Sequence, residues 1–244
     1  GYDPSNVFFD ANSYLYLLLI FPAIKYIDTK EKLNGLLKVI LTGVAVLAIE
    51  TLSLFVIFVK SQNLGFLEII YKWARDFRIG EITSLKNGAY RIFIQSHIYL
   101  LIGFFLLAIF RIYKKISARK YLLLGVLFCA AIYISLSRSL WIGFGAGLLV
   151  LSAALIYAKI SYKKILQLFT EIVAIIFIGT AITTLFIPDG SLLASRLKLG
   201  ESALNTRVEQ LKPLLPAIKN SPVFGYGFGK TLTFKSFDPR VTYV

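Results

Sequence analysis

The chain has 244 residues, of which 57% are hydrophobic and 16% are charged, and its formal net charge is +14. Soluble domains contain roughly 45–50% apolar residues, so this composition indicates an integral membrane protein. In a soluble protein such a charge could indicate nucleic-acid binding. Here the basic residues fall mostly in short loops between apolar runs, which is the topology signal of a membrane protein. We therefore expect an all-α, polytopic membrane protein without a nucleic-acid partner.

The apolar runs predict about six membrane-spanning helices, because a helix needs about 20 predominantly apolar residues to cross a bilayer. In chain order the predicted spans cover residues 13–27, 36–59, 97–113, 121–136, 140–158 and 165–187. The first span is short unless residues 7–9 extend it. Residues 60–95 are too polar to span, so we expect an interfacial helix followed by a loop there.

A turn signal divides the chain into two regions. Pro188-Asp189-Gly190 ends the last apolar run, so we predict a transmembrane domain at residues 1–187 and a partly helical, extracytoplasmic loop region at residues 188–244. The chain begins with Gly1, contains no Met and stops at Val244 without a polar tail. We interpret it as a fragment of a longer protein that lacks N-terminal spans and a C-terminal part.

The distribution of basic residues predicts the orientation in the membrane. Residues 25–38, 111–120 and 159–164 hold four, five and three Lys or Arg, whereas the short connection at residues 137–139 holds only Arg138. Such a bias, counted over short loops, places the three basic loops in the cytoplasm. The N-terminus, residues 60–95, Arg138 and the 188–244 region are then expected on the external face.

Arg138 is the first candidate functional residue. It lies between two long apolar runs, so it is either at the tip of a helical hairpin or inside the bilayer, and both positions are costly. The predicted orientation puts Arg138 on the external face, where the preference for basic residues in cytoplasmic loops does not explain it. The external face also collects an excess of cations, and guanidinium groups suit phosphate or pyrophosphate because they bind phosphoryl oxygens bidentately. For an individual loop lysine the alternative is simple contact with anionic headgroups.

The 188–244 region contains two patterns. Apolar residues recur at helical spacing, which predicts an amphipathic helix over residues 205–219 on the membrane surface, with Thr206 as N-cap, Arg207 in the first turn and a kink or early end at Pro213 and Pro216. The apolar positions are Leu204, Val208, Leu211, Leu215 and Ile218. Alternating glycines and aromatic residues follow at residues 223–229, and Gly225, Tyr226 and Gly227 are the candidate substrate-binding positions. A flexible turn is the other interpretation of this segment.

These motifs together resemble the O-antigen ligase and polymerase family. Residues 137–143 (Ser-Arg-Ser-Leu-Trp-Ile-Gly) resemble its Ser-Arg motif. Thr206-Arg207, followed by residues 222–229, resembles the Arg-helix-Pro-x-x-Gly-x-Gly segment of its large external loop. Tyr90-Arg91 resembles its arginine-containing entry into a span. The resemblance covers the chain in segment order from about residue 13.

The resemblance implies a metal-independent, inverting glycosyltransferase without a cofactor, located in the bacterial cytoplasmic membrane. Its donor would be an undecaprenyl-pyrophosphate-linked glycan, and its acceptor would be lipid A core for a ligase or another lipid-linked glycan for a polymerase. Arg138 and Arg207 would be the catalytic residues that hold the pyrophosphate, and Arg91 would be an auxiliary phosphate contact. The family's general-base histidine lies after the external loop, so we expect it beyond residue 244 and expect this fragment alone to be inactive.

Three ionisable residues within the predicted spans leave alternatives open. Glu50 and Glu171 could form a proton relay, which would favour a transporter or flippase of lipid-linked glycans, or could pair with neighbouring helices. His97 is interpreted as a headgroup-level or packing residue rather than the base. A structural subunit of an assembly complex is a third possibility, but it would leave Arg138 without a purpose.

Overall fold

The computed structural model describes residues 4–61, 64–77, 79–84, 90–186, 202–223, 225–228 and 230. The chain forms two compact units. The larger unit is Asn34–Leu192, and the smaller one combines Gly1–Leu33 with Leu193–Val244.

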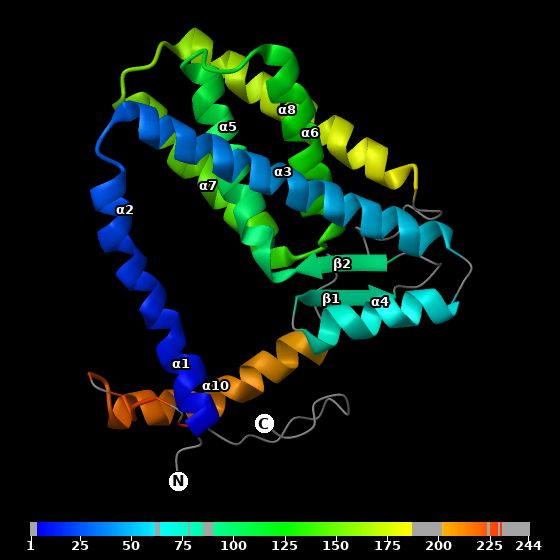
Figure 1. The fold of residues 1–244 in the computed structure, drawn as a ribbon, viewed down its shortest axis with the longest axis vertical. Helices are drawn as coiled ribbons and strands as arrows, with labels where there is room; N and C mark the ends of the chain where they lie inside the picture. Colours follow the sequence, from blue (N-terminus) through cyan, green and yellow to red (C-terminus); the bar gives the residue numbers. More distant parts are fainter. Residues whose placement is uncertain are drawn as a thin grey trace. The chain divides into compact units, whose positions relative to one another are not determined.

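The larger unit is a helical bundle with one small sheet (Figure 1). Its described elements are α3 (Lys30–Lys60, which begins in the smaller unit), α4 (Leu64–Asp76), β1 (Gly80–Ser84), β2 (Tyr90–Ile94), the short 3-10 helix η3 (Gln95–His97), α5 (Ile98–Ile112), α6 (Ala118–Ile134), α7 (Arg138–Tyr157) and α8 (Tyr162–Thr184).

Five helical segments in the described part of the chain are long and apolar enough to cross a membrane. They are Asn6–Tyr26, Lys30–Lys60, Gln95–Ile112, Arg138–Tyr157 and Tyr162–Thr184. The fourth predicted span, residues 121–136, corresponds to α6, whose 17 residues are at the lower limit of the roughly 17–25 that a bilayer requires. The predicted polytopic helical fold is confirmed.

The core of the bundle forms around α6, which packs along α5 on one side and α8 on the other. Phe104 of α5, Phe128 of α6 and Ile175 of α8 are all completely buried there. Small residues allow the close approach, as is usual between membrane helices. A β-carbon added to Gly125 of α6 would lie only 2.7 Å from Ile175. The helices are therefore held by packing along their lengths rather than by polar contacts in the core.

Short connections make α5, α6, α7 and α8 run in alternating directions. The turns at residues 113–117 and 158–161 consequently lie at one end of the bundle. It is called the basic end here because residues 111–120 and 159–164, which include or border these turns, hold five and three Lys or Arg. The turn at residues 135–137 lies at the other end, with β1 and β2, and this is called the hairpin end. The structure thus separates the two groups of loops that the charge bias distinguishes. Which end faces the cytoplasm stays a prediction.

At the basic end, polar contacts join neighbouring helices. Arg111 at the end of α5 donates from Nε and Nη2 to the two carboxylate oxygens of Glu171 on α8, at 2.9 and 2.6 Å. Gln167, one turn earlier on α8, donates to the same carboxylate at 3.0 Å. Lys115 donates to Asn34 of α3 at 3.0 Å. Glu171 is therefore paired with a neighbouring helix, as the second of its two interpretations predicted.

The segment at residues 60–95 contains the predicted helix, α4, but the loop predicted after it is wrong. Two antiparallel strands occur there, with Gly80 opposite Ile94 and Ser84 opposite Tyr90. Burial alternates along the end of β2 because successive side chains point to opposite faces of a strand, so that Ile92 and Ile94 are buried against α3 and α4. The alternation is only five residues long, which is why the polarity of the whole segment obscured it.

The smaller unit contains α1 (Pro4–Leu15), η1 (Tyr16–Leu19), α2 (Ile20–Tyr26) and α10 (Ser202–Asn220). The first three form a nearly continuous helical run, so the extension of the first predicted span toward residue 7 is confirmed. The predicted boundary at residues 187 and 188 lies outside the described residues, and the two-region division stays a prediction.

The predicted start of the helix at residues 205–219 is wrong. The helix begins at Ser202 rather than near Thr206, because the apolar stripe already includes Leu204 and a helix starting later would leave that residue off the stripe. Thr206 is therefore not the N-cap. Pro213 and Pro216 do not shorten the helix, which continues through both to Asn220, and the alternative of a kink at these prolines stays a prediction.

The hairpin should depend on the absence of a side chain at Gly80. A β-carbon there would collide with the backbone carbonyl oxygen of Phe93 on the partner strand. We expect Gly80→Ala to lower the free energy of unfolding by about 1–3 kcal/mol, the usual cost of overpacking, measured by thermal unfolding of the purified protein in detergent. Gly35→Ala is the matched control, because no atom lies within 4 Å of a β-carbon at Gly35 of α3. The Gly35→Ala variant should be neutral or stabilised by up to about 1 kcal/mol. An equal loss of stability in both variants would show that the space at Gly80 is not what the hairpin depends on.

Candidate functional site

The turn between α6 and α7 is a compact, serine-rich structure. Leu136 is buried and has a φ of 45°, a left-handed conformation that is uncommon for a bulky residue. Ser135 Oγ donates to the carbonyl of Ile132 at 2.6 Å and accepts from the backbone N–H of Ser137 at 3.3 Å. The hydroxyls of Ser137 and Ser139 are 2.9 Å apart. These bonds fix the backbone that leads into Arg138.

Arg138 is the first residue of α7, with Ser137 as the N-cap. The N-terminus of a helix carries a partial positive charge, so a cation there is disfavoured and an anion is favoured. Arg138 is only partly exposed, and its Nη2 atom is buried. A guanidinium at a positive helix end is the arrangement expected of a site that binds a negatively charged group.

Arg91 of β2 reaches this turn from far away in the sequence. Its Nε donates to the backbone carbonyl of Ser135 at 2.9 Å, across 44 residues of chain. Its Nη1 donates to Glu81 of β1 at 3.3 Å, and its guanidinium lies 5.1 Å from the centre of the Phe93 ring. Two of the three predicted arginine segments are therefore brought together at the hairpin end.

The hairpin explains why Arg91 points toward the turn. Side chains alternate between the two faces of a strand, and Ile92 and Ile94 occupy the face that packs on α3 and α4. Arg91 and Phe93 are left on the other face, toward the α6–α7 turn. Sequence reasoning missed the hairpin, although the dipeptide Asn87-Gly88 between two short alternating runs was a signal for it.

The remaining predicted site residues belong to the smaller unit. Arg207 lies in α10, but its side chain is outside the described residues. Gly225 and Gly227 have φ values of 60° and 82°, so both need the freedom of glycine. Tyr226 between them is 41% exposed, and the ammonium of Lys230 lies 5.9 Å from its ring centre. The described part of this loop thus presents two accessible aromatic rings, Tyr226 with a cation beside it and Phe228, which is 46% exposed.

His97 is a structural residue that connects three elements. Its side chain is fully buried, and its Nδ1 accepts from the backbone N–H of Ile94 at 3.4 Å. Thr51 of α3 uses its hydroxyl hydrogen for the carbonyl of Leu47, so its oxygen is the acceptor for Nε2–H of His97 at 2.9 Å. Both ring nitrogens are occupied in a neutral imidazole. This agrees with the packing interpretation.

Glu50 is the remaining ionisable residue within a span. It is exposed on α3 and borders a small cavity of about 10 Å³ between α3, α4 and the hairpin.

No three side chains of His, Cys, Asp or Glu come together as a metal-ligand group in the described parts of the chain. The arginines at the hairpin end can bind an anion electrostatically.

The comparison with known protein families identifies a family for the second half of the chain. Residues 123–242 match the model of a family described as O-antigen ligase. The match includes α6, the serine-rich turn, α7, α8 and α10. No curated protein and no solved structure shows significant similarity to the chain.

The two partners of Arg91 should contribute unequally to stability. Arg91→Leu leaves the carbonyl of Ser135 without this donor, and Ser135 is completely buried, so we expect a loss of about 1–3 kcal/mol. Glu81→Gln removes an ion pair whose carboxylate is 69% exposed, and we expect less than about 0.5 kcal/mol. Thermal unfolding gives both values, and amide hydrogen exchange at residues 135–139 should accelerate only in Arg91→Leu. Equal losses would show that the arginine does not fasten the turn.

Proposed function

The chain belongs to the O-antigen ligase family, as residues 123–242 show, and from this premise we propose that it transfers a glycan from an undecaprenyl-pyrophosphate carrier to an acceptor hydroxyl at the outer face of the cytoplasmic membrane. The acceptor would be lipid A core or another lipid-linked glycan. Membrane helices and the family together support glycan transfer in polysaccharide biosynthesis. The carrier, the acceptor and the sidedness are part of the proposal.

One structural observation supports the proposed diphosphate site in addition to the family. The hydrogen bond from Arg91 to Ser135 brings an arginine of the hairpin against the turn that begins α7 with Arg138. Two cations from distant segments and a helix N-terminus thus converge at one end of the bundle. A diphosphate is the part of the proposed donor that needs such a concentration of positive charge.

The proposed reaction is an inverting displacement. The acceptor oxygen attacks the anomeric carbon of the donor glycan, and the bond between that carbon and the diphosphate oxygen breaks. The carrier diphosphate leaves with the bonding electrons, and the proton of the acceptor hydroxyl passes to a general base. The role of the arginines is to stabilise the negative charge that grows on the leaving diphosphate, as preorganised donors do in oxyanion holes.

The proposal assigns the residues as follows. Arg138 and Arg207 contact the diphosphate, and Arg91 is an auxiliary phosphate contact that also positions the turn through its bond to Ser135. Gly225 and Gly227 shape a loop whose Tyr226 offers a flat face to a sugar ring. No metal and no cofactor takes part.

The transporter or flippase alternative depends on Glu50 and Glu171 as ionisable sites within spans. Glu171 is bound by Arg111 through two hydrogen bonds and has a structural partner. The alternative thereby loses one of its two carboxylates, and no contact of Glu50 with another described residue favours it.

The arginine roles are tested by substitution in the full-length protein. Arg138→Ala and Arg207→Ala should each lower glycan transfer by about a hundredfold or more, the usual cost of removing one such donor, in an assay with a lipid-linked donor. Arg138→Lys should keep part of the activity because it keeps the charge but not the bidentate geometry. Arg119→Ala at the basic end is the matched control and should retain wild-type transfer. Normal transfer by both alanine variants, correctly inserted in the membrane, would refute the proposal.

A further inference from the structure

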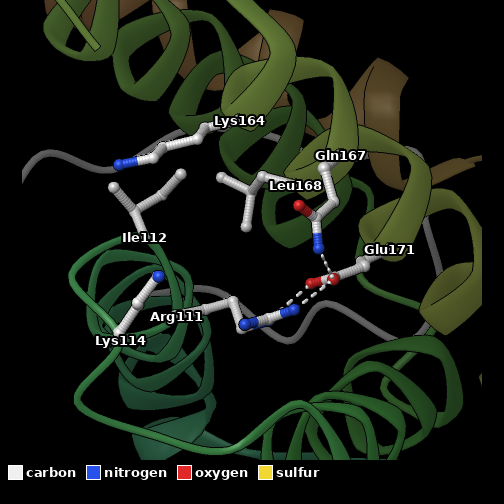
Figure 2. A pocket seen from close by; sticks show the side chains of 7 residues that line it. All are labelled: Arg111, Ile112, Lys114, Lys164, Gln167, Leu168 and Glu171. Atoms are coloured by element: carbon white, nitrogen blue, oxygen red, sulfur yellow. Dashed lines mark hydrogen bonds and ion pairs between the residues drawn. The ribbon is translucent and has the colours of Figure 1, made fainter. Parts of the chain in front are cut away.

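A cationic cavity lies at the basic end of the bundle, between the end of α5 and the beginning of α8. Its volume is about 210 Å³, which is room for roughly seven water molecules at 30 Å³ each. Figure 2 shows the side chains around it, which are Arg111, Ile112, Lys114, Lys164, Gln167, Leu168 and Glu171. The cavity is remote from the Arg138 turn, because α5 runs from the hairpin end to the basic end.

The charges in the cavity are not balanced. The carboxylate of Glu171 is already bound by Arg111 at 2.6 and 2.9 Å and by Gln167 at 3.0 Å. The lysines Lys114 and Lys164 therefore form an excess of two positive charges, and neither has an ion-pair partner among the described residues. Figure 2 shows these two side chains on one side and the Arg111–Glu171 pair on the other. An anion is the ligand that would balance this site.

The backbone holds Lys114 in place. It has a φ of 54°, and the N–H groups of Lys114 and Lys115 bond to the carbonyls of Arg111 and Phe110 at 3.1 and 2.8 Å. This is the Schellman arrangement that ends a helix, at a position that usually holds glycine. The lysine also lies at the negative end of the α5 dipole, which favours its charge. Its ammonium thus projects from a fixed turn rather than from a flexible loop.

The rest of the cavity is apolar. Ile112 and Leu168 line it and are 8% and 1% exposed. Both helices that border it are long and apolar enough to cross a membrane, and the cavity lies near one end of each. Lipid phosphates occur at that level, and basic pockets between membrane helices bind anionic headgroups. A free anion in water would gain nothing from the apolar wall.

We propose that this cavity binds the phosphate group of an anionic membrane phospholipid between Lys114 and Lys164. The lipid joins the end of α5 to the beginning of α8 and supplements the Arg111–Glu171 pair. This site does not depend on the proposed glycan transfer, because it lies at the other end of the bundle and its test is a binding measurement.

The test compares lipids and matched lysine variants of the full chain in detergent. Bound lipid is measured by native mass spectrometry after addition of phosphatidylglycerol or phosphatidylcholine. We expect the unaltered protein to retain phosphatidylglycerol in preference to phosphatidylcholine. The double variant Lys114→Gln/Lys164→Gln should bind phosphatidylglycerol about thirtyfold more weakly. The control, Lys159→Gln/Lys163→Gln, removes the same charge from the same end, and Lys159 also has a φ of 54°. It should bind as the unaltered protein does.

Four results would overturn the proposal. Equal weakening in the two double variants would indicate general attraction to the basic end, and no weakening in either would show that the cavity is not the site. Displacement of the lipid by millimolar inorganic phosphate would indicate a soluble anion instead. A photoactivatable phosphatidylglycerol added to the unaltered protein should label residues 110–116 and 162–171. Labelling elsewhere would also overturn the proposal. This measurement uses only the unaltered protein, so it does not depend on whether a variant folds.

Discussion

The hydrogen bond from Arg91 to the carbonyl of Ser135 is the contact on which the candidate site depends. It links a hairpin that precedes α5 to the turn between α6 and α7, and a bond from a charged donor is stronger than a neutral one. The hairpin is fixed in turn by His97, which bonds to Thr51 of α3 and to Ile94 of β2. Arg138 therefore begins its helix at a place that several distant segments define together.

The two ends of the bundle hold their charges differently. At the hairpin end, Arg91 and Arg138 flank a serine-rich turn and a helix N-terminus, where negative charge is favoured. At the basic end, Arg111 is neutralised by Glu171, while Lys114 and Lys164 lie beside an apolar cavity. Both arrangements suit phosphate groups, and we propose a diphosphate as the ligand of the first and a phospholipid as the ligand of the second.

Much of the fold followed from the sequence because membrane helices leave a strong signal. Long apolar runs and short basic loops gave the order of the spans, and Ser137-Arg138 was placed correctly at a turn between two of them. The hairpin was missed because its five-residue strands alternate too briefly to stand out in a polar segment. The start of α10 was misplaced because Thr206 looked like a cap, although Leu204 already belonged to the apolar stripe.

The candidate site residues were chosen from the sequence and their roles stay a prediction, whereas their contacts were found only in the structure. Arg138 was unusual for its apolar surroundings, and Arg91 was recognised only through the family resemblance. That Arg91 bonds to a backbone carbonyl 44 residues away depends on tertiary packing, which no local pattern records. The partner of Glu171 was likewise hidden, since Arg111 looked like one more charge in a basic loop.

The central claim is that Arg138 and Arg207 meet at one diphosphate, and a distance between their helices tests it most directly. Spin labels at Ile142 and Leu211, each one turn beyond its arginine and 73% and 47% exposed, would be measured by pulsed electron resonance in the full-length protein with undecaprenyl diphosphate. The only cysteine, Cys129, is buried and would be replaced by alanine. The account predicts a single short distance near the lower limit of the method. A distance of about 30 Å or more, the thickness of the bilayer core, would contradict it.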